Sequence, residues 1–179
     1  LKDHLLGVAE SSRKLISNLL EVCGQTLQLA PSALRNVAYV IGVTHDVGKA
    51  TRYFQEFLPP QRIRPRDPML KAHSILSTLY GYFAARRLFS TSEYSNLIPS
   101  YVSFVIQGHH GALQNPNVSI IKRLDWRKTI ADQISAIERR DEFDLILQEA
   151  GLPRFSDFES QAESEIMAGL LQKAGYEIV

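Results

Sequence analysis

The residues best suited to chemistry in this sequence are its five histidines, His4, His45, His73, His109 and His110. Helical spacing places apolar residues three or four positions from several of them, so we expect these imidazoles to point toward the core. A buried imidazole usually has its own hydrogen-bond partner, which is the simpler interpretation of each histidine taken alone. Taken together, imidazoles from converging helices would meet in one cleft and, with Asp46, ligate a divalent metal or a pair of them.

A carboxylate and an ammonium follow the second histidine. Asp46 comes directly after His45 and would add a hard oxygen and a negative charge to the same site. Successive helical side chains diverge by about 100°, so both face one cleft only if the last turn loosens near Gly48. Lys49 either contacts a phosphate oxygen held by the metal or stabilises the C-terminus of its helix, and the spacing leaves both interpretations open.

Length and composition indicate one globular domain over residues 1–179. Hydrophobic residues make up 45% and charged residues 22%, a balance that excludes a disordered chain. The single cysteine excludes a disulfide framework and favours a reducing, cytoplasmic compartment. A net charge of +1 is not the basic excess of a protein that coats duplex DNA. No apolar run approaches the roughly 20 residues of a membrane span, and because the chain begins with Leu1 we expect a trimmed or partial polypeptide.

The elements that must position these side chains are predicted to be helices, which makes the fold class all-α. Apolar residues recur every three to four positions from Leu1 to Val22 and predict an amphipathic helix that ends near Gly24. A second helix is expected from an N-cap at Ser32 to Gly48. Asp67 and Pro68 predict the N-cap and first residue of the helix that carries His73.

The rest of the chain is also predicted to be helical between loops. Four prolines make residues 58–68 a loop, and residues 108–117 form a second loop. The β-branched and aromatic stretch from Tyr101 to Ile106 is compatible with a strand, but we predict a helix. Further helices are expected over 118–140 and 141–149, and a final one after a capping box formed by Ser156 and Glu159.

Three motifs together resemble a known family. The string VTHDVGKA, residues 43–50, resembles the defining motif of HD-domain metal-dependent phosphohydrolases. His4, His73 and the GHHG string at residues 108–111 narrow the resemblance to the HD nuclease domain of the CRISPR-associated nuclease-helicase of type I systems. HDVGKATRYFQEFL, residues 45–58, is similar to that family's version, in which an aromatic-rich segment follows the lysine. The resemblance spans residues 4–111 and implies a compact HD-domain helical bundle.

The resemblance implies two transition-metal ions. The first would be held by His4, His45 and Asp46, and Asp46 would bridge to a second held by His73, His109 and His110. Histidine-rich ligation favours Mn, Ni, Co or Fe over Mg, and binding should weaken below about pH 6 because the imidazoles must lose protons. The family completes its first site with a late aspartate. Five aspartates of the second half are candidates for it, and none of them has a recognisable motif: Asp125, Asp132, Asp141, Asp144 and Asp157.

The activity implied by the resemblance is hydrolysis of phosphodiester bonds in single-stranded DNA, as an endonuclease or exonuclease in antiviral defence. Asp46 and Lys49 would be the catalytic residues. The implied partners are single-stranded DNA, a helicase domain or subunit and an RNA-guided CRISPR surveillance complex, and no membrane. The chain has no Walker-type loop, so the motor is expected elsewhere. Two alternatives stay open: a phosphohydrolase for nucleotides or cyclic dinucleotides, and a degenerate, non-catalytic HD module.

No nucleic-acid-binding residues are assigned. Two cationic clusters could contact a strand, one in the proline-rich loop and one after GHHG, but a solvated charged face is the preferred interpretation of both: Arg62, Arg64, Arg66, Lys122, Arg123, Arg127 and Lys128. Tyr53, Phe54 and Phe57 could stack on bases, although their spacing is more typical of a core stripe.

Overall fold

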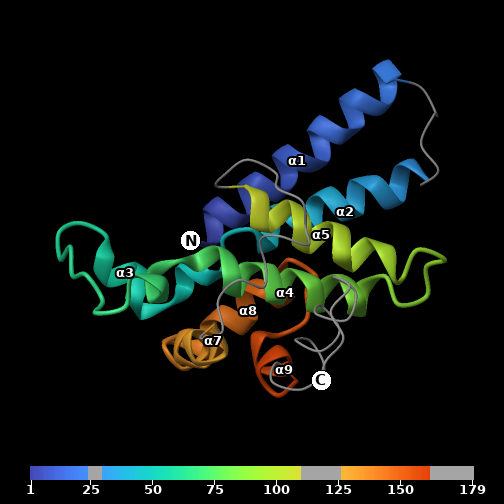
Figure 1. Ribbon diagram of the computed structural model, residues 1–179. Helices are drawn as coiled ribbons and strands as arrows, with labels where there is room; N and C mark the ends of the chain where they lie inside the picture. Colours follow the sequence, from blue (N-terminus) through green and yellow to red (C-terminus); the bar gives the residue numbers. More distant parts are fainter. Residues whose placement is uncertain (24–29, 110–125, 162–179) are drawn as a thin grey trace.

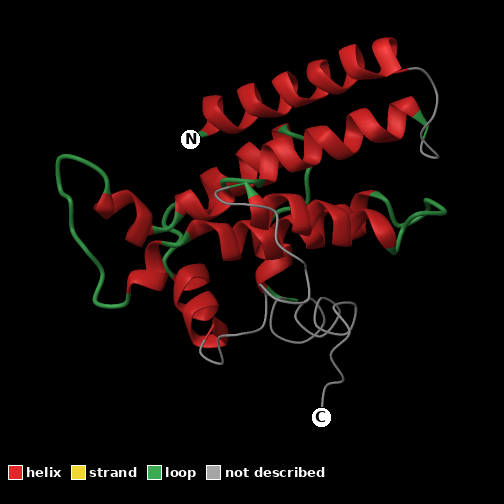
Figure 2. Ribbon diagram, turned by 45° about the horizontal axis from the view of Figure 1, so that its top comes forward, coloured by secondary structure: helices red, strands yellow, loops and turns green. Residues whose placement is uncertain are grey.

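The computed structural model describes residues 1–23, 30–109 and 126–161 (Figures 1 and 2). Helices dominate this part of the chain, which confirms the all-α fold class, and its β-type pairing is limited to one bridge between Thr51 and Ile137. The helices are α1 (Lys2–Cys23), α2 (Pro31–Thr44), α3 (Arg52–Phe57), α4 (His73–Leu88), α5 (Leu97–Gly108), α7 (Trp126–Ser135), α8 (Arg140–Glu149) and α9 (Phe155–Glu159), with short 3-10 helices η1 (Val47–Ala50) and η2 (Pro68–Lys71). None of the described helices is both long and apolar enough to cross a bilayer.

The first two helices form a hairpin whose far end extends from the rest of the molecule (Figure 1). They approach closely because Gly42 faces Ala9: a Cβ on Gly42 would lie 2.5 Å from the Ala9 Cα. The amphipathic helix expected from Leu1 to Val22, ending near Gly24, is confirmed as α1. Among its described side chains, Leu5 and Ala9 are buried, whereas Leu15 is 60% exposed on the part of α1 that projects from the bundle (Figure 1).

The second helix has different ends from those predicted. It begins at Pro31, whose fixed φ suits the first helical position, so Ser32 is not its N-cap. The α-helix stops at Thr44 and does not continue to Gly48. His45 is its C-cap, Asp46 leaves helical geometry with a φ of −119°, and the chain then tightens into η1.

The fourth helix is the centre of the bundle (Figure 1). Residues 76–85 are all buried, because α2, α5, α7 and α9 pack around α4. Its Tyr80 ring lies against Phe155 and Phe158, with centroids 5.8 and 5.7 Å away. Asp67 is an N-cap as predicted, accepting a hydrogen bond from the Met69 N–H, but it caps η2 and not α4, which begins only at His73.

The later helices confirm part of the prediction. Residues 101–106 are helical within α5, as expected. The helix expected over 118–140 ends at Ser135, because the Ala136 carbonyl accepts a hydrogen bond from the Arg52 N–H and Ile137 bridges to Thr51; residues 118–125 lie outside the described part. The Ser156–Glu159 capping box is wrong: α9 has Arg154 at its N-cap position, without a side-chain cap.

Candidate metal centre

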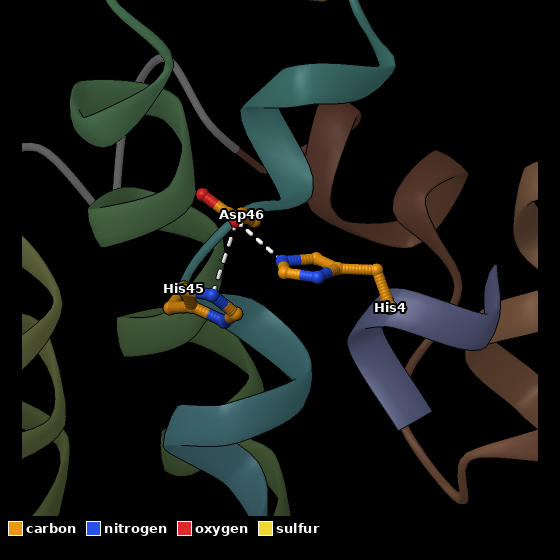
Figure 3. A group of neighbouring side chains, drawn as sticks. All are labelled: His4, His45 and Asp46. Carbon is orange, nitrogen blue, oxygen red and sulfur yellow. Dashed lines mark hydrogen bonds and ion pairs between the residues drawn. The ribbon is translucent and has the colours of Figure 1, made fainter. Parts of the chain in front are cut away.

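Asp46 occupies the centre of the histidine cluster, at the junction of α2 and η1, and is 2% exposed. Its Oδ2 lies 2.7 Å from the Nε2 of His4, 3.1 Å from the Nε2 of His45 and 2.6 Å from the Nζ of Lys49. Figure 3 shows the His4 ring reaching across from α1 and the His45 ring rising from the end of α2 toward the same carboxylate. Because the α-helix ends at Thr44 and Asp46 has a non-helical backbone conformation, the side chains of residues 45 and 46 can point toward the same site.

The second carboxylate oxygen of Asp46 faces the other two described histidines. Oδ1 lies 3.0 Å from the Nε2 of His73 and 3.5 Å from the Nε2 of His109. His73 is the first residue of α4 and His109 is the C-cap of α5, so both imidazoles project from helix ends. The structure therefore brings together four of the five sequence-predicted histidines around Asp46, while His110 lies outside the described residues.

The cluster divides into two groups of possible metal-binding atoms that share one residue. His4, His45 and Asp46 form the first, and Asp46, His73 and His109 form the second. Within each group the ligand atoms all lie within 4.8 Å of one another, so a single cation could contact all of them after small side-chain shifts. The expectation that His4 points into the core needs correction, because its side chain is 48% exposed at the mouth of the cluster.

The hydrogen bonds behind two imidazoles suit metal ligation. The Nδ1 of His45 lies 2.8 Å from the Gly42 carbonyl oxygen, and the Nδ1 of His109 contacts the Ile106 carbonyl oxygen. A carbonyl only accepts, so each Nδ1 carries the hydrogen and each Nε2 of a neutral ring presents a lone pair. Each Nε2 lone pair points at a carboxylate oxygen, and two such acceptors need a proton or a metal cation between them. Metal-ligating histidines usually have the same kind of hydrogen bond from the ring nitrogen that does not ligate. The residues present therefore fit a metal ion.

Charge interactions dominate the protonation of this cluster. Burial alone would raise the pKa of Asp46, but hydrogen bonds from His109, His45, His73 and Lys49 outweigh it and hold that pKa well below its usual range. The hydrogen bond to Asp46 raises the pKa of His109 against the opposing effect of its burial, and the Ile106 carbonyl adds to the rise. Asp46 is therefore ionised throughout the physiological range, and His109 keeps its proton to a higher pH than a free imidazole.

These shifts predict how the metal-free protein responds to pH. The raised pKa of His109 stabilises the fold below the ordinary value of 6.5, and this contribution is lost as the pH rises through the raised pKa. The lowered pKa of Asp46 stabilises the fold above 3.8, and is lost only as the pH falls through the lowered pKa. In urea unfolding with a chelator present, the pair of Asp46 and His109 should therefore contribute more to the free energy of unfolding at about pH 5.5 than at about pH 8.

Asp46→Asn is the control for that measurement, since it removes the partner that shifts the pKa of His109. The free energy of unfolding should change more between the two pH values in the wild type than in the variant. Equal changes in the two proteins would contradict the prediction. Bound metal should reverse the trend, because each imidazole must lose its proton before it ligates.

Lys49 and the aromatic segment after it lie beside the cluster. Lys49 contacts Asp46 directly from η1, and its Nζ lies 5.6 Å from the centroid of the Phe54 ring. The preferred core stripe of Tyr53, Phe54 and Phe57 is wrong, because α3 has no buried residue. The Phe54 ring meets the His73 imidazole edge-on at 4.9 Å, so α3 lines the rim of the cluster.

The cationic clusters of the sequence lie at the surface where they are described. The three loop arginines and one α7 lysine are exposed: Arg62, Arg64, Arg66 and Lys128. Residues 122 and 123 lie outside the described part, as does the side chain of residue 127.

A late aspartate is absent from both metal groups in the described part of the chain. Asp144 instead holds the start of α9: its carboxylate accepts hydrogen bonds from the Phe155 N–H and from the Ser156 hydroxyl, the latter at 2.7 Å. Asp157 pairs with Arg154 at the surface, and Asp125 lies outside the described residues. Asp144 is buried, and its carboxylate serves to hold the start of α9 and does not belong to either metal group.

Removing the Asp144 carboxylate should therefore reduce stability without changing metal binding. Asp144→Ala leaves the buried Phe155 N–H without its charged acceptor, which should lower the free energy of unfolding by about 2 kcal/mol. Urea unfolding measures this loss, and Asp157→Ala, at an exposed ion pair, is the control with a smaller effect. A Mn²⁺ titration altered by Asp144→Ala would contradict the structural assignment.

Three positioning features were missed or misread from the sequence. Gly48 does not merely loosen a helix: a Cβ there would lie 2.2 Å from the His73 carbonyl oxygen, so only glycine allows η1 to pack on the start of α4. Its N–H donates to the Ser77 hydroxyl at 2.9 Å. Gln133 on α7 contacts the segment before His73. The glycine of the HDVGK string was a usable signal, whereas Ser77 and Gln133 carry none in sequence.

Comparison with known proteins identifies the family of this chain. Residues 1–174 match the family model described as Cas3, HD domain. Neither the curated proteins nor the solved structures give a match to this chain. The family match extends beyond the motifs of residues 4–111 and includes α7, α8 and α9. With its cluster of imidazoles around an HD aspartate, the chain belongs to the Cas3 HD-domain family of metal-dependent hydrolases.

Proposed function

We propose that this chain is a metal-dependent nuclease that hydrolyses phosphodiester bonds of single-stranded DNA in type I CRISPR interference. The observation that carries the proposal is that Asp46 belongs to two groups of possible metal-binding atoms at once. Such sharing is the arrangement expected of a two-metal phosphodiesterase centre. Membership of the Cas3 HD-domain family supports the nuclease class and the association with CRISPR.

The proposed ligands follow the two groups. His4, His45 and Asp46 would hold one ion, and Asp46, His73 and His109 the other, with His110 added to the second. Four imidazoles around one carboxylate favour a transition metal such as Mn, Ni, Co or Fe over Mg, which prefers oxygen. When bound, two such ions supply Lewis acidity toward a phosphoryl oxygen and lower the pKa of water.

The chain's own residues would orient the reaction. The Nδ1 hydrogen bonds of His45 and His109 fix which nitrogen of each ring faces Asp46, so these ligands need little rearrangement. Lys49 is partly exposed beside Asp46, and its ammonium would contact a phosphoryl oxygen as negative charge develops there. Asp46 and Lys49 are thus the proposed catalytic residues.

The proposed partners are single-stranded DNA, a helicase domain or subunit, and an RNA-guided surveillance complex. The family match supports the last two. For the strand, one candidate contact is the loop between α3 and η2, where Arg62, Arg64 and Arg66 are exposed. Contacts of such cations with phosphates would make binding weaken as the salt concentration rises.

Substrate competition tests the proposal. The protein is stripped with a chelator, reloaded with Mn²⁺ or Ni²⁺, and given single-stranded DNA, duplex DNA, nucleotides and cyclic dinucleotides in parallel. We expect cleavage of single-stranded DNA that His45→Ala suppresses and that Asp157→Asn, at a surface ion pair, leaves intact. Hydrolysis of nucleotides without strand cleavage would instead support a small-molecule phosphohydrolase. A protein that takes up no metal and is indifferent to His45→Ala would be a non-catalytic module.

A further inference from the structure

Gln133 makes an unusual set of contacts from the last turn of α7. Its side chain is fully buried, at 0% exposure. Its Nε2 donates toward three backbone carbonyls of one short segment, at 3.2 Å to Met69, 3.0 Å to Leu70 and 3.0 Å to Ala72. An amide nitrogen has two hydrogens, so these contacts use its whole donor capacity, with one hydrogen shared.

The Oε1 of the same amide is buried and has no hydrogen-bond partner among the described residues. A buried amide oxygen without a partner is unfavourable. Gln133 therefore contributes to the fold through its nitrogen, that is, through its hold on residues 69–72.

The segment held by Gln133 leads directly into a residue of the metal centre. It comprises η2 and Ala72, and the next residue, His73, begins α4. Ala72 occupies the N-cap position and has no side chain that could cap the helix. The place at which α4 begins is therefore determined by contacts from other elements, with Gly48 of η1 on His73 itself and Gln133 on the residues before it.

The two residues that directly follow α7 also contact the chain after the HD motif. The Ala136 carbonyl accepts a hydrogen bond from the Arg52 N–H at 2.8 Å, and Ile137 bridges to Thr51. Residues 133–137 thus touch both segments whose relative placement sets the distance between Asp46 and His73.

We infer that Gln133 is a positioning residue for the metal centre, whose amide nitrogen fixes the junction of η2 and α4 and so orients His73 toward Asp46. The inference rests on the proposed function, because it takes His73 as a metal ligand. Its effect should be confined to the group of Asp46, His73 and His109, since His4 and His45 are placed by α1 and α2.

Metal titration of the full chain tests this inference without an activity assay. Gln133→Met keeps the length of the side chain and removes the donor, and Gln148→Met makes the same change at an exposed site on α8. Calorimetry with Mn²⁺ on the metal-free variants identifies one binding step as the step that His73→Ala removes. Gln133→Met should weaken the affinity of this step by about 10- to 100-fold, the usual range for residues that orient metal ligands. The step that His4→Ala removes should stay unchanged, as should both steps in Gln148→Met.

A purely structural role would give a different pattern. If Gln133→Met lowers the urea midpoint but leaves both Mn²⁺ steps at wild-type affinity, the inference is overturned. Should that variant not fold, Gln133→Asn keeps the amide on a shorter arm; it should weaken the same step less, and unchanged binding would again overturn the inference. If His73→Ala itself leaves Mn²⁺ binding intact, the ligand assignment of the proposed function fails, and this result is distinct from a failure at Gln133.

Discussion

Asp46→Asn should abolish metal-dependent cleavage and weaken binding of both ions together. Asp46 is the residue common to both metal groups, and its carboxylate contacts Lys49 and the described histidines of both. Residues that only orient a ligand cost about 10- to 100-fold in metal affinity when they are replaced, so loss of a shared ligand should exceed about 100-fold. Asparagine keeps the shape of the side chain but loses the negative charge that two cations would share.

Calorimetry with Mn²⁺ and a strand-cleavage assay measure this effect, and Asp132→Asn provides the control. Asp132 is an aspartate of α7 that belongs to neither metal group. A variant that loses one ion and binds the other at wild-type affinity would show that Asp46 does not bridge. Loss of cleavage with intact binding of both ions would limit its role to the reaction.

Gly48→Ala should damage both the fold and the metal centre, although it adds only one methyl group. The added Cβ would lie 2.2 Å from the His73 carbonyl oxygen and 2.8 Å from the His73 Cα. Backbone atoms cannot turn aside as a flexible side chain does, so η1 and α4 must separate, which should cost about 3 kcal/mol of stability. The separation also moves His73 away from Asp46 and weakens the hydrogen bond from the Gly48 N–H to Ser77.

Gly7→Ala is the matched control for this change. Gly7 lies in α1, and a Cβ there would meet nothing within 4 Å. Because alanine is the better helix former, this variant should gain about 0.5–1 kcal/mol. Urea unfolding in a chelator, followed by Mn²⁺ titration, compares the two variants. Equal stability of Gly48→Ala and wild type would contradict the prediction, because it would mean that η1 and α4 tolerate the added methyl group.

The sequence predicted most of the helical elements of the described part but placed several of their ends wrongly. The helices expected over Leu1 to Val22 and over 141–149 match α1 and α8, and the ambiguous stretch at 101–106 lies within α5. The ends were misplaced because distant contacts decide them. Ser156 reads locally as a cap, but its hydroxyl instead donates to the buried Asp144 carboxylate of a neighbouring helix.

The candidate site shows the same division. The residue types and the HD-x-G-K spacing were enough to predict a metal-binding family and its candidate ligands, because ligation needs particular donor atoms, and the family match confirms the family. Sequence could not give the distances, since His4, His73 and His109 come from three separate helices.

Only the tertiary structure decided that these imidazoles meet on the two oxygens of Asp46. The close approaches at Gly42 and Gly48 bring the helices that carry them into contact, and Gln133 holds the segment before His73. A local pattern fixes the chemistry of a side chain, but its position depends on packing between segments that are far apart in the chain.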